Sequence, residues 1–574
     1  MFPTTNIDEF FVNENAEFEV LLSVLSKQVN SNYGSGFAIV LDSDGNMVGI
    51  VEDSDLRKFY HQNPSKNPRI KDVMQTNFIS VSNNLNETEV ISEVISQMDS
   101  RGWATSLPVK IIPVLDNLKP IGLIDAEEIH SVIQQHKNNY IVVGLGYVGL
   151  TLALSLSALG RRVYGFDADL NRIDQLLKLK SYILEPGIDS LLKKHLNNNF
   201  HVNSKLYSVN EKPGNQNTYF ICVGTPLRLD KTPDLEPIWS VVNELLKIIK
   251  NGDVIVMRST VPVGLGKEIV SFIESKLNWS VGINFHYIAA PERTVEGNAL
   301  REIIELPQIM SGATASCQVI GLNIFRGLVN SVTPIDKIEG VELVKIIGNA
   351  YRDYAFGFAN YFIEICRRYG LDINQIIESS NRGYPRSNIP SPSPGVGGPC
   401  LSKDTYFLPK SDNDQEISPL IAVRNVNEKV PSESVKFISG IIPNLNAYNC
   451  IGIGIAFKGV PETNDFRNSP SIDFLISLSK IVDFIKVWDN AIVNTNSNLE
   501  FPFDTELDTY NFYAILNNNP KNIDFFNKKV LTSNADEILV FDPWRMIKPN
   551  QIIYANRVKL VHYFSLSHYE KFYI

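Results

Sequence analysis

Residues 140–150 read YIVVGLGYVGL, a short apolar run followed by glycines at positions 144, 146 and 149. The apolar run has the composition of a buried parallel strand, and a helical pattern follows the last glycine. A G-x-G-x-x-G turn between a strand and a helix lets the backbone approach a pyrophosphate, toward which the helix points its free amides. The stretch therefore predicts a dinucleotide-binding α/β lobe in which Gly144, Gly146 and Gly149 lie at the phosphates.

The next predicted strand, RRVYGFD, ends at Asp167, 23 residues after Gly144. An acid at this place accepts hydrogen bonds from both ribose hydroxyls of NAD, and it repels the 2′-phosphate of NADP. We therefore expect NAD as the cofactor. The structural alternative is a glycine-rich turn with a helix-capping acid.

Short β-rich runs alternate with helical segments from residue 140 to about 330, and a similar alternation returns after residue 435. This order is typical of doubly wound parallel sheets. Between the two regions, residues 340–370 contain no proline and predict one long amphipathic helix. The predicted fold class is α/β, with two Rossmann-like lobes that a long helical segment joins and a tandem α+β module precedes. The expected domains are 1–136, 137–332 for NAD binding, 333–435 for the helical segment with the Cys400 loop, and 436–574.

The N-terminal module contains an internal near-repeat, AIVLDSDGNMVGIVEDSDL at 38–56 and IPVLDNLKPIGLIDAEEI at 112–129. Each copy predicts a strand, a tight turn, a second strand and the start of a helix. The pair resembles a tandem of CBS (cystathionine-β-synthase type) modules, which often sense adenine nucleotides. The resemblance implies an adenine nucleotide as a ligand, with Asp55 on its ribose, and a structural or oligomerising role is the alternative.

The composition is that of an ordinary globular protein, with 44% hydrophobic residues, 20% charged residues and a net charge of −10. The acidic balance argues against nucleic acid as a partner. No apolar run approaches the roughly 20 residues that span a bilayer, and the N-terminus lacks the basic start of a signal peptide. We therefore expect a cytoplasmic protein without a membrane partner.

Five cysteines lie far apart, without the spacing of a zinc site or of a disulfide scaffold, and we expect no metal. Cys222, Cys317, Cys366 and Cys450 lie in or beside aliphatic stretches and are expected to be ordinary apolar residues. Cys400 differs, because it lies in PSPSPGVGGPCLSKD, a stretch of glycines and prolines without a periodic core pattern. We single it out as a candidate functional residue.

Eight short motifs occur along the chain in an order that resembles the UDP-glucose/GDP-mannose dehydrogenase family. They are GLGYVGL at 144–150, EPG at 185–187, VGTP at 223–226, STVPVG at 259–264, APERTVEGNAL at 290–300, LVKIIGNA at 343–350, GVGGPCLSKD at 395–404 and AFKGVPETNDFRNSP at 456–470. The resemblance covers roughly residues 138–574. It implies an NAD-dependent nucleotide-sugar 6-dehydrogenase, which oxidises the C6 alcohol of a UDP-sugar to a carboxylate and binds that UDP-sugar in the C-terminal lobe.

The resemblance also implies roles for individual residues. The catalytic positions that match are Cys400, Lys345, Asn349, Asp404 and Glu292, of which Glu292 lies near the substrate or acts as a base for water. The positions implied to contact the cofactor are Gly144, Gly146, Tyr147, Val148, Gly149, Asp167, Thr225, Thr260, Glu296 and Lys403. The positions implied to contact the substrate are Arg293, Arg386, Gly397, Lys458 and Arg467, and a surface ion pair is the alternative for Arg467.

The chemistry of such a reaction suits these residue types. Taking a primary alcohol to an acid removes four electrons, so an aldehyde must be held while a second NAD replaces the first NADH. Cys400 can add to the aldehyde to give a thiohemiacetal, which loses a second hydride and becomes a thioester that water hydrolyses. The thiol needs a nearby positive charge or dipole, because a free thiol is mostly protonated at neutral pH.

Lys345 and Asn349 lie four residues apart and therefore share one face of the predicted helix. An ammonium and an amide donor suit the oxyanion that forms at C6. Asp404, four residues beyond Cys400, can position or deprotonate water.

Other interpretations remain at this point. A two-electron β-hydroxyacid dehydrogenase also combines a Rossmann lobe, a helical lobe and a lysine with an asparagine four residues on, but it needs neither Cys400 nor a third lobe. A nucleotide-sensing module with a degenerate dehydrogenase conflicts with the intact glycine turn.

The substrate is predicted less sharply than the reaction. Residues 380–401 are similar to those of members that act on UDP-N-acetylhexosamines, UDP-N-acetylmannosamine above all, and UDP-N-acetylglucosamine and UDP-glucose stay open. The implied product is a uronic-acid sugar for a surface polysaccharide or lipopolysaccharide. The long central helix and the family predict a homodimer or a higher homo-oligomer.

Overall fold

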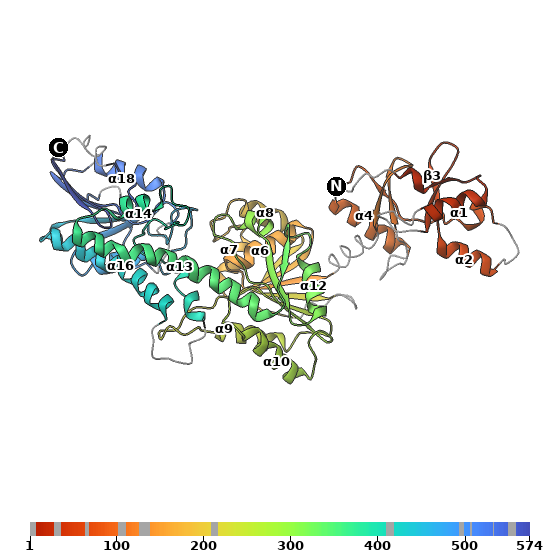
Figure 1. Cartoon of the computed structure of the whole chain (residues 1–574), viewed down its shortest axis with the longest axis horizontal. Helices are drawn as coiled ribbons and strands as arrows, with labels where there is room; N and C mark the ends of the chain where they lie inside the picture. Colours follow the sequence, from red (N-terminus) through yellow and green to blue (C-terminus); the bar gives the residue numbers. More distant parts are fainter. Residues whose placement is uncertain are drawn as a thin grey trace. The chain divides into compact units, whose positions relative to one another are not determined.

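A computed structural model of the chain places its residues in two compact units (Figure 1). The N-terminal unit contains residues 1–138 with 159–162, and the main unit contains residues 139–158 with 163–574. The structure describes residues 7–27, 36–62, 68–85, 87–101, 111–125, 138–207, 216–408, 418–492, 499–505, 508–531, 533–548 and 558–573.

The N-terminal unit contains two three-stranded sheets with the same strand order. In each sheet a short first strand pairs in parallel with the second, which pairs antiparallel with the third. The register shifts at an equivalent place in both hairpins, between Val40 and Leu41 and between Val114 and Leu115. The near-repeat of the sequence therefore corresponds to a repeated local topology. The elements are β1 (Phe11–Asn13), α1 (Phe18–Lys27), β2 (Phe37–Leu41), β3 (Met47–Glu52), α2 (Asp53–Gln62), α3 (Ile70–Val73), β4 (Val81–Ser82), α4 (Glu87–Ser100), β5 (Ile111–Asp116) and β6 (Lys119–Asp125).

The two hairpins share a core. Phe37 and Ile39 of the first copy and Ile111 and Leu123 of the second belong to one buried hydrophobic cluster. Burial of apolar surface between the copies stabilises the pair as one unit. The helix start that the sequence predicts after residue 125 lies outside the described residues.

The first sheet of the main unit has eight strands in the order β14-β13-β12-β11-β10-β7-β8-β9. The pairs β14–β13, β12–β11, β11–β10, β10–β7 and β8–β9 are parallel, and β12 and β13 are antiparallel. The strand order reverses at β7, so the carboxyl ends of β7 and β10 open the crevice where such sheets bind ligands. The strands are β7 (Asn139–Val143), β8 (Arg162–Phe166), β9 (Phe200–Asn203), β10 (Asn217–Ile221), β11 (Val254–Met257), β12 (His286–Ala289), β13 (Gln308–Gly312) and β14 (Val332–Pro334).

Helices follow most of these strands. They are α6 (Tyr147–Ala158), α7 (Leu170–Leu177), α8 (Ile188–His195), α9 (Glu236–Leu245), α10 (Leu265–Leu277), α11 (Ala299–Glu305) and α12 (Ala315–Phe325). The glycine turn at 144–149 lies between the end of β7 and the start of α6, where the sequence predicts it.

The predicted long helix is α13 (Ile338–Tyr369), which contains 32 residues and therefore extends about 48 Å. It packs against β12 and β13, and near its other end Arg367 Nε donates to Leu566 O at 2.8 Å in the last lobe (Figure 1). Helix α16 (Pro419–Ile441) packs along it. The shorter elements of this segment are α14 (Ile373–Asn381), α15 (Gly398–Leu401) and the 3₁₀ turn η3 (Asp404–Phe407).

The last lobe is a six-stranded sheet in the order β16-β15-β17-β18-β19-β20, parallel except for its last pair. Its elements are β15 (Cys450–Ile453), α17 (Pro470–Leu478), β16 (Ile485–Trp488), β17 (Phe512–Ile515), α18 (Lys521–Leu531), β18 (Glu537–Phe541), β19 (Leu560–Phe564) and β20 (Tyr569–Tyr573). The main unit therefore confirms the predicted α/β class with two Rossmann-like lobes.

The turn after the first strand is built alike in the two lobes. Gly144 N donates to Phe166 O at 2.7 Å, and Gly454 N donates to Trp488 O at 2.8 Å. In the last lobe, however, the following helix α17 begins only at Pro470, so this turn does not lead into a helix N-terminus. Within the residues that the structure describes, no helix has the length and apolar character needed to cross a membrane.

Candidate active site

The glycine turn after β7 leaves room for a dinucleotide. Gly144 has φ +91°, and a Cβ there would lie 2.9 Å from the backbone of Cys222, whereas no described atom lies within 4 Å of a Cβ placed at Gly146. Tyr147 and Val148 open α6, whose first amides lack partners within the helix. The open side of Gly146 beside a helix N-terminus therefore fits a pyrophosphate.

Asp167 is fixed at the carboxyl end of β8, beside this turn. Its Oδ2 accepts from Leu145 N at 2.8 Å and pairs with Arg172 Nη1 at 3.1 Å, and its Oδ1 accepts from Asp169 N at 2.9 Å. Carboxylate oxygens have capacity for further hydrogen bonds, so the group can also accept from ribose hydroxyls. The geometry fits the cofactor that the sequence predicts.

A chain of hydrogen bonds joins five of the predicted site residues. Thr225 Oγ1 donates to Thr260 O at 2.8 Å and accepts from Lys403 Nζ at 3.4 Å. Lys403 Nζ also binds Asp404 Oδ1 at 2.5 Å, and Asp404 Oδ2 accepts from Asn349 Nδ2 at 2.6 Å. Asp404 and Asn349 are buried. The strand ends of the first lobe are thus connected to helix α13 through the segment that follows Cys400.

Lys345 lies one turn before Asn349 on α13. It lines a small pocket together with Thr260, Pro291 and Glu342. The Lys345 ammonium forms no hydrogen bond or ion pair with another residue of the described ranges, although the backbone of Lys345 is part of α13. Its ammonium is therefore available to a ligand oxygen in the pocket.

Cys400 lies on the short helix α15 and is exposed. The protein packed around its thiol and the charge of Asp404 raise the pKa of Cys400, while Lys345 and Lys403 lower it to a smaller extent. The structure therefore differs from the expectation of a thiol activated by cations. The two ammonium groups act on the thiol, but they do not outweigh its desolvation by neighbouring protein atoms and the charge of Asp404. Addition of this thiol to a carbonyl consequently needs a base.

The cysteine segment packs directly against the last lobe. A Cβ at Gly397 would lie 2.0 Å from Asn468 O, the oxygen that accepts from Gly398 N at 3.0 Å. A Cβ at Gly398 would lie 2.5 Å from the Phe457 ring, and the φ of Gly398 is +84°. Backbone contact at this distance is open only to glycine, which explains why the motif before Cys400 is rich in it.

The loop after β12 carries both predicted glutamates. Lys458 Nζ donates to Glu296 O at 2.7 Å, and Thr463 Oγ1 donates to Glu296 Oε2 at 2.9 Å, so Glu296 joins the first lobe to the last. Burial and the charge of Asp465 raise the pKa of Glu296. Glu292 forms an ion pair with the buried guanidinium of Arg258.

Other predicted residues are engaged elsewhere. Arg293 Nη2 donates to Pro307 O at 2.5 Å, and Arg386 is exposed with its guanidinium 4.9 Å from the Tyr384 ring. Arg467 Nη2 pairs with Asp465 Oδ2 at 2.5 Å, which is the ion-pair alternative for this residue, although its charge still acts on Glu296. The contacts of the described ranges do not link Arg293 or Arg386 to Cys400.

Asp55 of the N-terminal unit is buried, and its carboxylate has partners within that unit. Oδ2 accepts from Glu52 N at 2.9 Å, and Oδ1 accepts from Gln75 Nε2 at 2.5 Å. The Asp55 carboxylate therefore connects the end of β3 to the segment after α3. This arrangement differs from the expectation that the carboxylate faces a ligand.

Family models and known relatives match the main unit. The NAD-binding domain of the UDP-glucose/GDP-mannose dehydrogenase family matches residues 138–329, and the central domain of that family matches residues 339–429. A UDP-N-acetyl-D-mannosamine dehydrogenase of Methanococcus vannielii is 32% identical over 346 residues, which are 59% of this chain and 76% of that protein. The chain belongs to the UDP-glucose/GDP-mannose dehydrogenase family.

Two further proteins are similar to this chain. An NDP-N-acetyl-D-galactosaminuronic acid dehydrogenase of Ralstonia solanacearum is 29% identical over 58% of this chain and 78% of that protein. The solved UDP-D-ManNAc dehydrogenase of Pyrococcus horikoshii is similar with a TM-score of 0.63 and 25% identity, over 72% of this chain and 96% of that one. As a member of the family, the protein is an NAD-dependent nucleotide-sugar dehydrogenase.

Several residues that were not predicted from the sequence also form hydrogen bonds or ion pairs at the site. Arg258 binds Glu292, Thr463 binds Glu296, and Glu185 of the EPG motif accepts from Tyr147 Oη and from Gly297 N at 2.9 Å. Glu342 accepts from Gly264 N and Gly266 N at 2.7 and 2.9 Å, and burial raises its pKa to about 7. All four residues lie in or beside the motifs quoted above. Their functions, however, become clear only from the partners that they bind, which are far away in the sequence.

Proposed function

We propose that the chain oxidises the C6 alcohol of UDP-N-acetyl-D-mannosamine to the carboxylate in two NAD-dependent steps, with Cys400 as the covalent nucleophile. The observation that carries the proposal is the hydrogen-bond chain from Thr260 to Asn349, because it connects the cofactor crevice to the segment of Cys400. The relatives from M. vannielii and P. horikoshii, which are named for this sugar nucleotide, support the choice of substrate.

NAD supplies the acceptor for each of the two hydrides. In the first oxidation the C6 hydroxyl loses its proton and C6 loses a hydride, which leaves an aldehyde. Lys345 and Asn349 are assigned to the C6 oxygen, since an unpaired ammonium and an amide of the same helix face can stabilise its negative charge. The second hydrogen of Asn349 Nδ2 is available for this, because the first is donated to Asp404.

In the second oxidation the Cys400 thiol loses its proton and Sγ bonds to C6, which gives a thiohemiacetal. Loss of the second hydride from C6 and of the proton from its hydroxyl leaves a thioester. Water then bonds to C6 as the C–S bond breaks, which releases the uronate and returns a proton to the thiol. Asp404 is assigned as the base for the thiol and for water, because its charge acts on Cys400 more strongly than that of any other group.

The substrate proposal predicts a stoichiometry and a preference. We expect two NADH per UDP-N-acetylmannosamine, and a kcat/KM at least about tenfold above those for UDP-N-acetylglucosamine, UDP-N-acetylgalactosamine and UDP-glucose, a difference of about 1.4 kcal/mol. NADH absorbance with limiting sugar nucleotide measures both. A stoichiometry of one would instead favour the two-electron alternative, and a preference for another sugar would correct the substrate alone.

We assign the nucleotide part of the substrate to the last lobe, residues 436–574, and NAD to the lobe at 137–332, on either side of the helical segment 333–435. Lys458 and Thr463 of the last lobe contact the loop of Glu296, which supports a substrate bound between the lobes. Burial lowers the pKa of Lys458, as expected for an ammonium held away from water.

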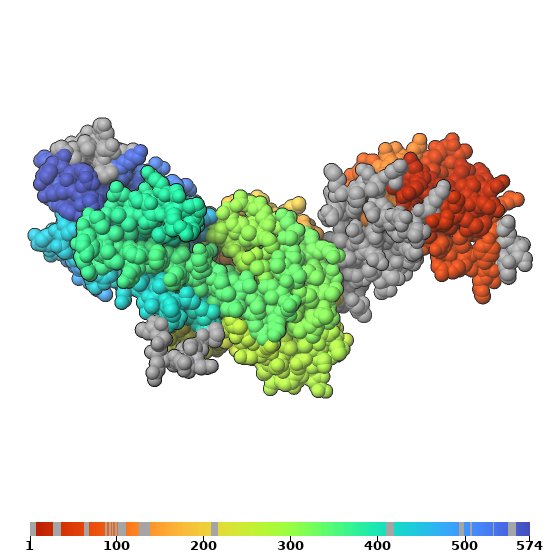
Figure 2. Space-filling model, viewed as in Figure 1, coloured from red at the N-terminus to blue at the C-terminus, as the bar shows by residue number. Residues whose placement is uncertain are grey.

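We also propose that the protein forms a homodimer through α13. Large apolar side chains at 347, 351, 354, 358, 361, 365 and 369 are exposed, and their spacing of three and four residues makes one continuous stripe along the helix. Figure 2 shows the green surface of this segment uncovered on the side in view. A stripe with this spacing is typical of a helix that packs against a second helix.

The dimer is tested with Tyr351→Asp and Tyr361→Asp combined, since these side chains are 67% and 58% exposed in the stripe. Two buried charges in a helix pair are expected to weaken the dimer at least about 100-fold. Light scattering after size-exclusion chromatography measures the mass. Tyr573→Asp, which places a charge on an equally exposed tyrosine of β20, is the control and should leave the mass unchanged.

For the N-terminal unit we propose a CBS-like pair, supported by the repeated strand order and the matching register shifts. Because both oxygens of Asp55 have partners within the unit, we assign Asp55 to the stability of the first copy, and an adenine nucleotide would have to be held by other groups. Calorimetric titration of the whole chain with ATP and AMP measures such binding.

A further inference from the structure

Arg258 is a fully buried arginine whose role does not follow from any motif of the sequence. It comes directly after β11, and its side chain is 0% exposed. A guanidinium stays charged in proteins, and burying it costs several kcal/mol unless its charge and its donors are satisfied. The groups that bind its guanidinium therefore indicate the role of Arg258.

Those partners belong mainly to the loop after β12. Arg258 Nη1 donates to Ala290 O at 2.8 Å and to Gln308 Oε1 at 2.6 Å, and Nη2 binds Glu292 Oε2. The Phe325 ring lies 5.6 Å from the guanidinium carbon. Arg258 thus holds both ends of the short segment 290–292, and Pro291 between them lines the pocket of Lys345.

The Glu292 carboxylate is fixed on both oxygens. Oε2 binds Arg258, and Oε1 accepts from Arg293 N at 2.7 Å and from Thr294 N at 2.9 Å. Burial acts to raise the pKa of Glu292, but Arg258 above all, then the two backbone amides and Lys345, lower it below its usual value. Three ionisable side chains face this carboxylate from three elements: Arg258 after β11, Lys345 on α13 and Cys222 after β10.

We propose that Arg258 is a positioning residue for the oxidation, which keeps the Glu292 carboxylate ionised and fixed beside the pocket that Lys345 lines. The inference rests on the proposed function in that the fixed negative charge of Glu292 then acts on Lys345 and on the water that hydrolyses the thioester. Without a cation at position 258, desolvation of the Glu292 carboxyl would be less opposed, and the pKa of Glu292 would rise.

The charge of Arg258 and its packing are separated by a pair of variants. Arg258→Met removes the charge. Arg258→Lys retains a cation beside Glu292 but loses the separate Nη1, which binds Ala290 O and Gln308 while Nη2 binds Glu292. With Arg258→Met, we expect the acidic limb of the pH profile of kcat to move upward by at least about one pH unit. With Arg258→Lys the limb should stay within about 0.3 units of wild type, even if kcat falls.

A second readout does not depend on the substrate. Carbon NMR of protein labelled at the glutamate carboxyl carbon reports the titration of Glu292 directly, and loss of one signal in Glu292→Gln assigns it. We expect this signal to titrate at a higher pH in Arg258→Met and at an almost unchanged pH in Arg258→Lys. Arg258→Gln, which is neutral but keeps a donor for Ala290 O, replaces the methionine variant if that variant does not fold.

Each outcome decides the proposal. An unchanged titration of Glu292 in the neutral variants, or an equal upward shift in Arg258→Lys, would overturn it. A shifted titration without a shifted limb of kcat would retain the electrostatic effect of Arg258 but remove Glu292 from the reaction. Failure of UDP-N-acetylmannosamine as a substrate would leave the NMR result standing, so the two proposals fail separately.

Discussion

Replacement of Cys400 with serine is expected to stop the reaction after the first hydride. The hydroxyl is a much weaker nucleophile than a thiol, so the aldehyde is not captured and no thioester forms. We expect NADH per UDP-N-acetylmannosamine to fall from two to one or less, and the rate of uronate formation to fall on the order of 10³-fold or more. Lys345, Asn349 and the cofactor turn remain in place, so the first oxidation is retained.

The measurement is NADH release with limiting sugar nucleotide, with a hydrazine present to trap the aldehyde. Cys366→Ala is the matched control, because Cys366 is a buried cysteine in the last turn of α13 and contacts no residue assigned to catalysis. It should keep a stoichiometry of two even if the protein becomes less stable. Uronate formation by Cys400→Ser at the wild-type rate would exclude the thioester route.

Alanine at Gly397 is expected to remove activity without touching a reacting group. Its Cβ would lie 2.0 Å from Asn468 O and 2.6 Å from Pro470 Cδ, so the segment of Cys400 must move away from the last lobe. Displacement of a nucleophile by about 1 Å costs on the order of 100-fold in rate, and the overpacking itself costs about 1–3 kcal/mol of stability. We therefore expect kcat to fall about 100-fold while the affinity for NAD stays unchanged.

Gly440→Ala provides the comparison, because a Cβ at this position of α16 meets no described atom within 4 Å. This variant should be as active as wild type and slightly more stable, since alanine favours a helix over glycine by about 1 kcal/mol. Steady-state kinetics and the thermal midpoint compare the two variants. Wild-type kcat in Gly397→Ala would show that the close contact with Asn468 does not position Cys400.

The features that could be predicted are those that depend on the spacing of residues close together in the sequence. The G-x-G-x-x-G turn lies between β7 and α6, and the proline-free run at 340–370 forms α13. Local rules suffice for both, since glycine spacing fixes a turn and apolar periodicity fixes a helix. The order of strands and helices likewise predicted both Rossmann-like lobes.

What could not be predicted depends on partners far apart in the chain. Arg258 and Glu292 are 34 residues apart, and Gly397 meets an oxygen of Asn468. No local sequence pattern predicts such pairs. From the sequence alone, a buried arginine therefore cannot be distinguished from any other charged residue at the end of a strand. The same limit explains the thiol of Cys400, whose pKa depends on the burial that only the folded chain shows.

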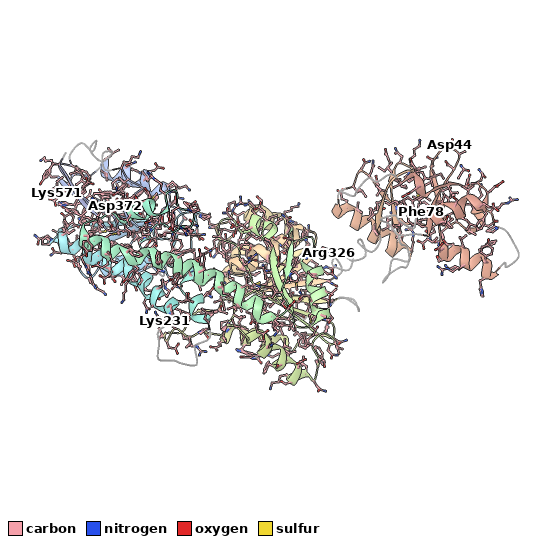
Figure 3. All side chains as sticks on the ribbon, in the orientation of Figure 1. Asp44, Phe78, Lys231, Arg326, Asp372 and Lys571 are labelled. Atoms are coloured by element: carbon pink, nitrogen blue, oxygen red, sulfur yellow. The ribbon has the colours of Figure 1, made fainter. Side chains whose placement is uncertain are left out.

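The contacts of loop residues could not be predicted, for a related reason. Arg293 and Arg386 carry long side chains on exposed segments, where several oxygens and rings are within reach. Arg293 donates to Pro307 O and Arg386 lies against Tyr384. By contrast, Lys231, which is labelled in Figure 3, is held by the fold: its Nζ donates to Tyr406 Oη and Glu428 Oε2 at 2.9 and 2.8 Å.

The contact between Gly397 and Asn468 also orders events during synthesis of the chain. The ribosome completes the cysteine segment roughly 70 residues before the oxygen against which it packs, an interval of several seconds at about 5–20 residues per second. During that interval the cofactor lobe can fold, but the segment of Cys400 does not yet have the contact with Asn468 that fixes its conformation. If the proposed function holds, a chain released within this interval is expected to bind NAD but not to capture the aldehyde.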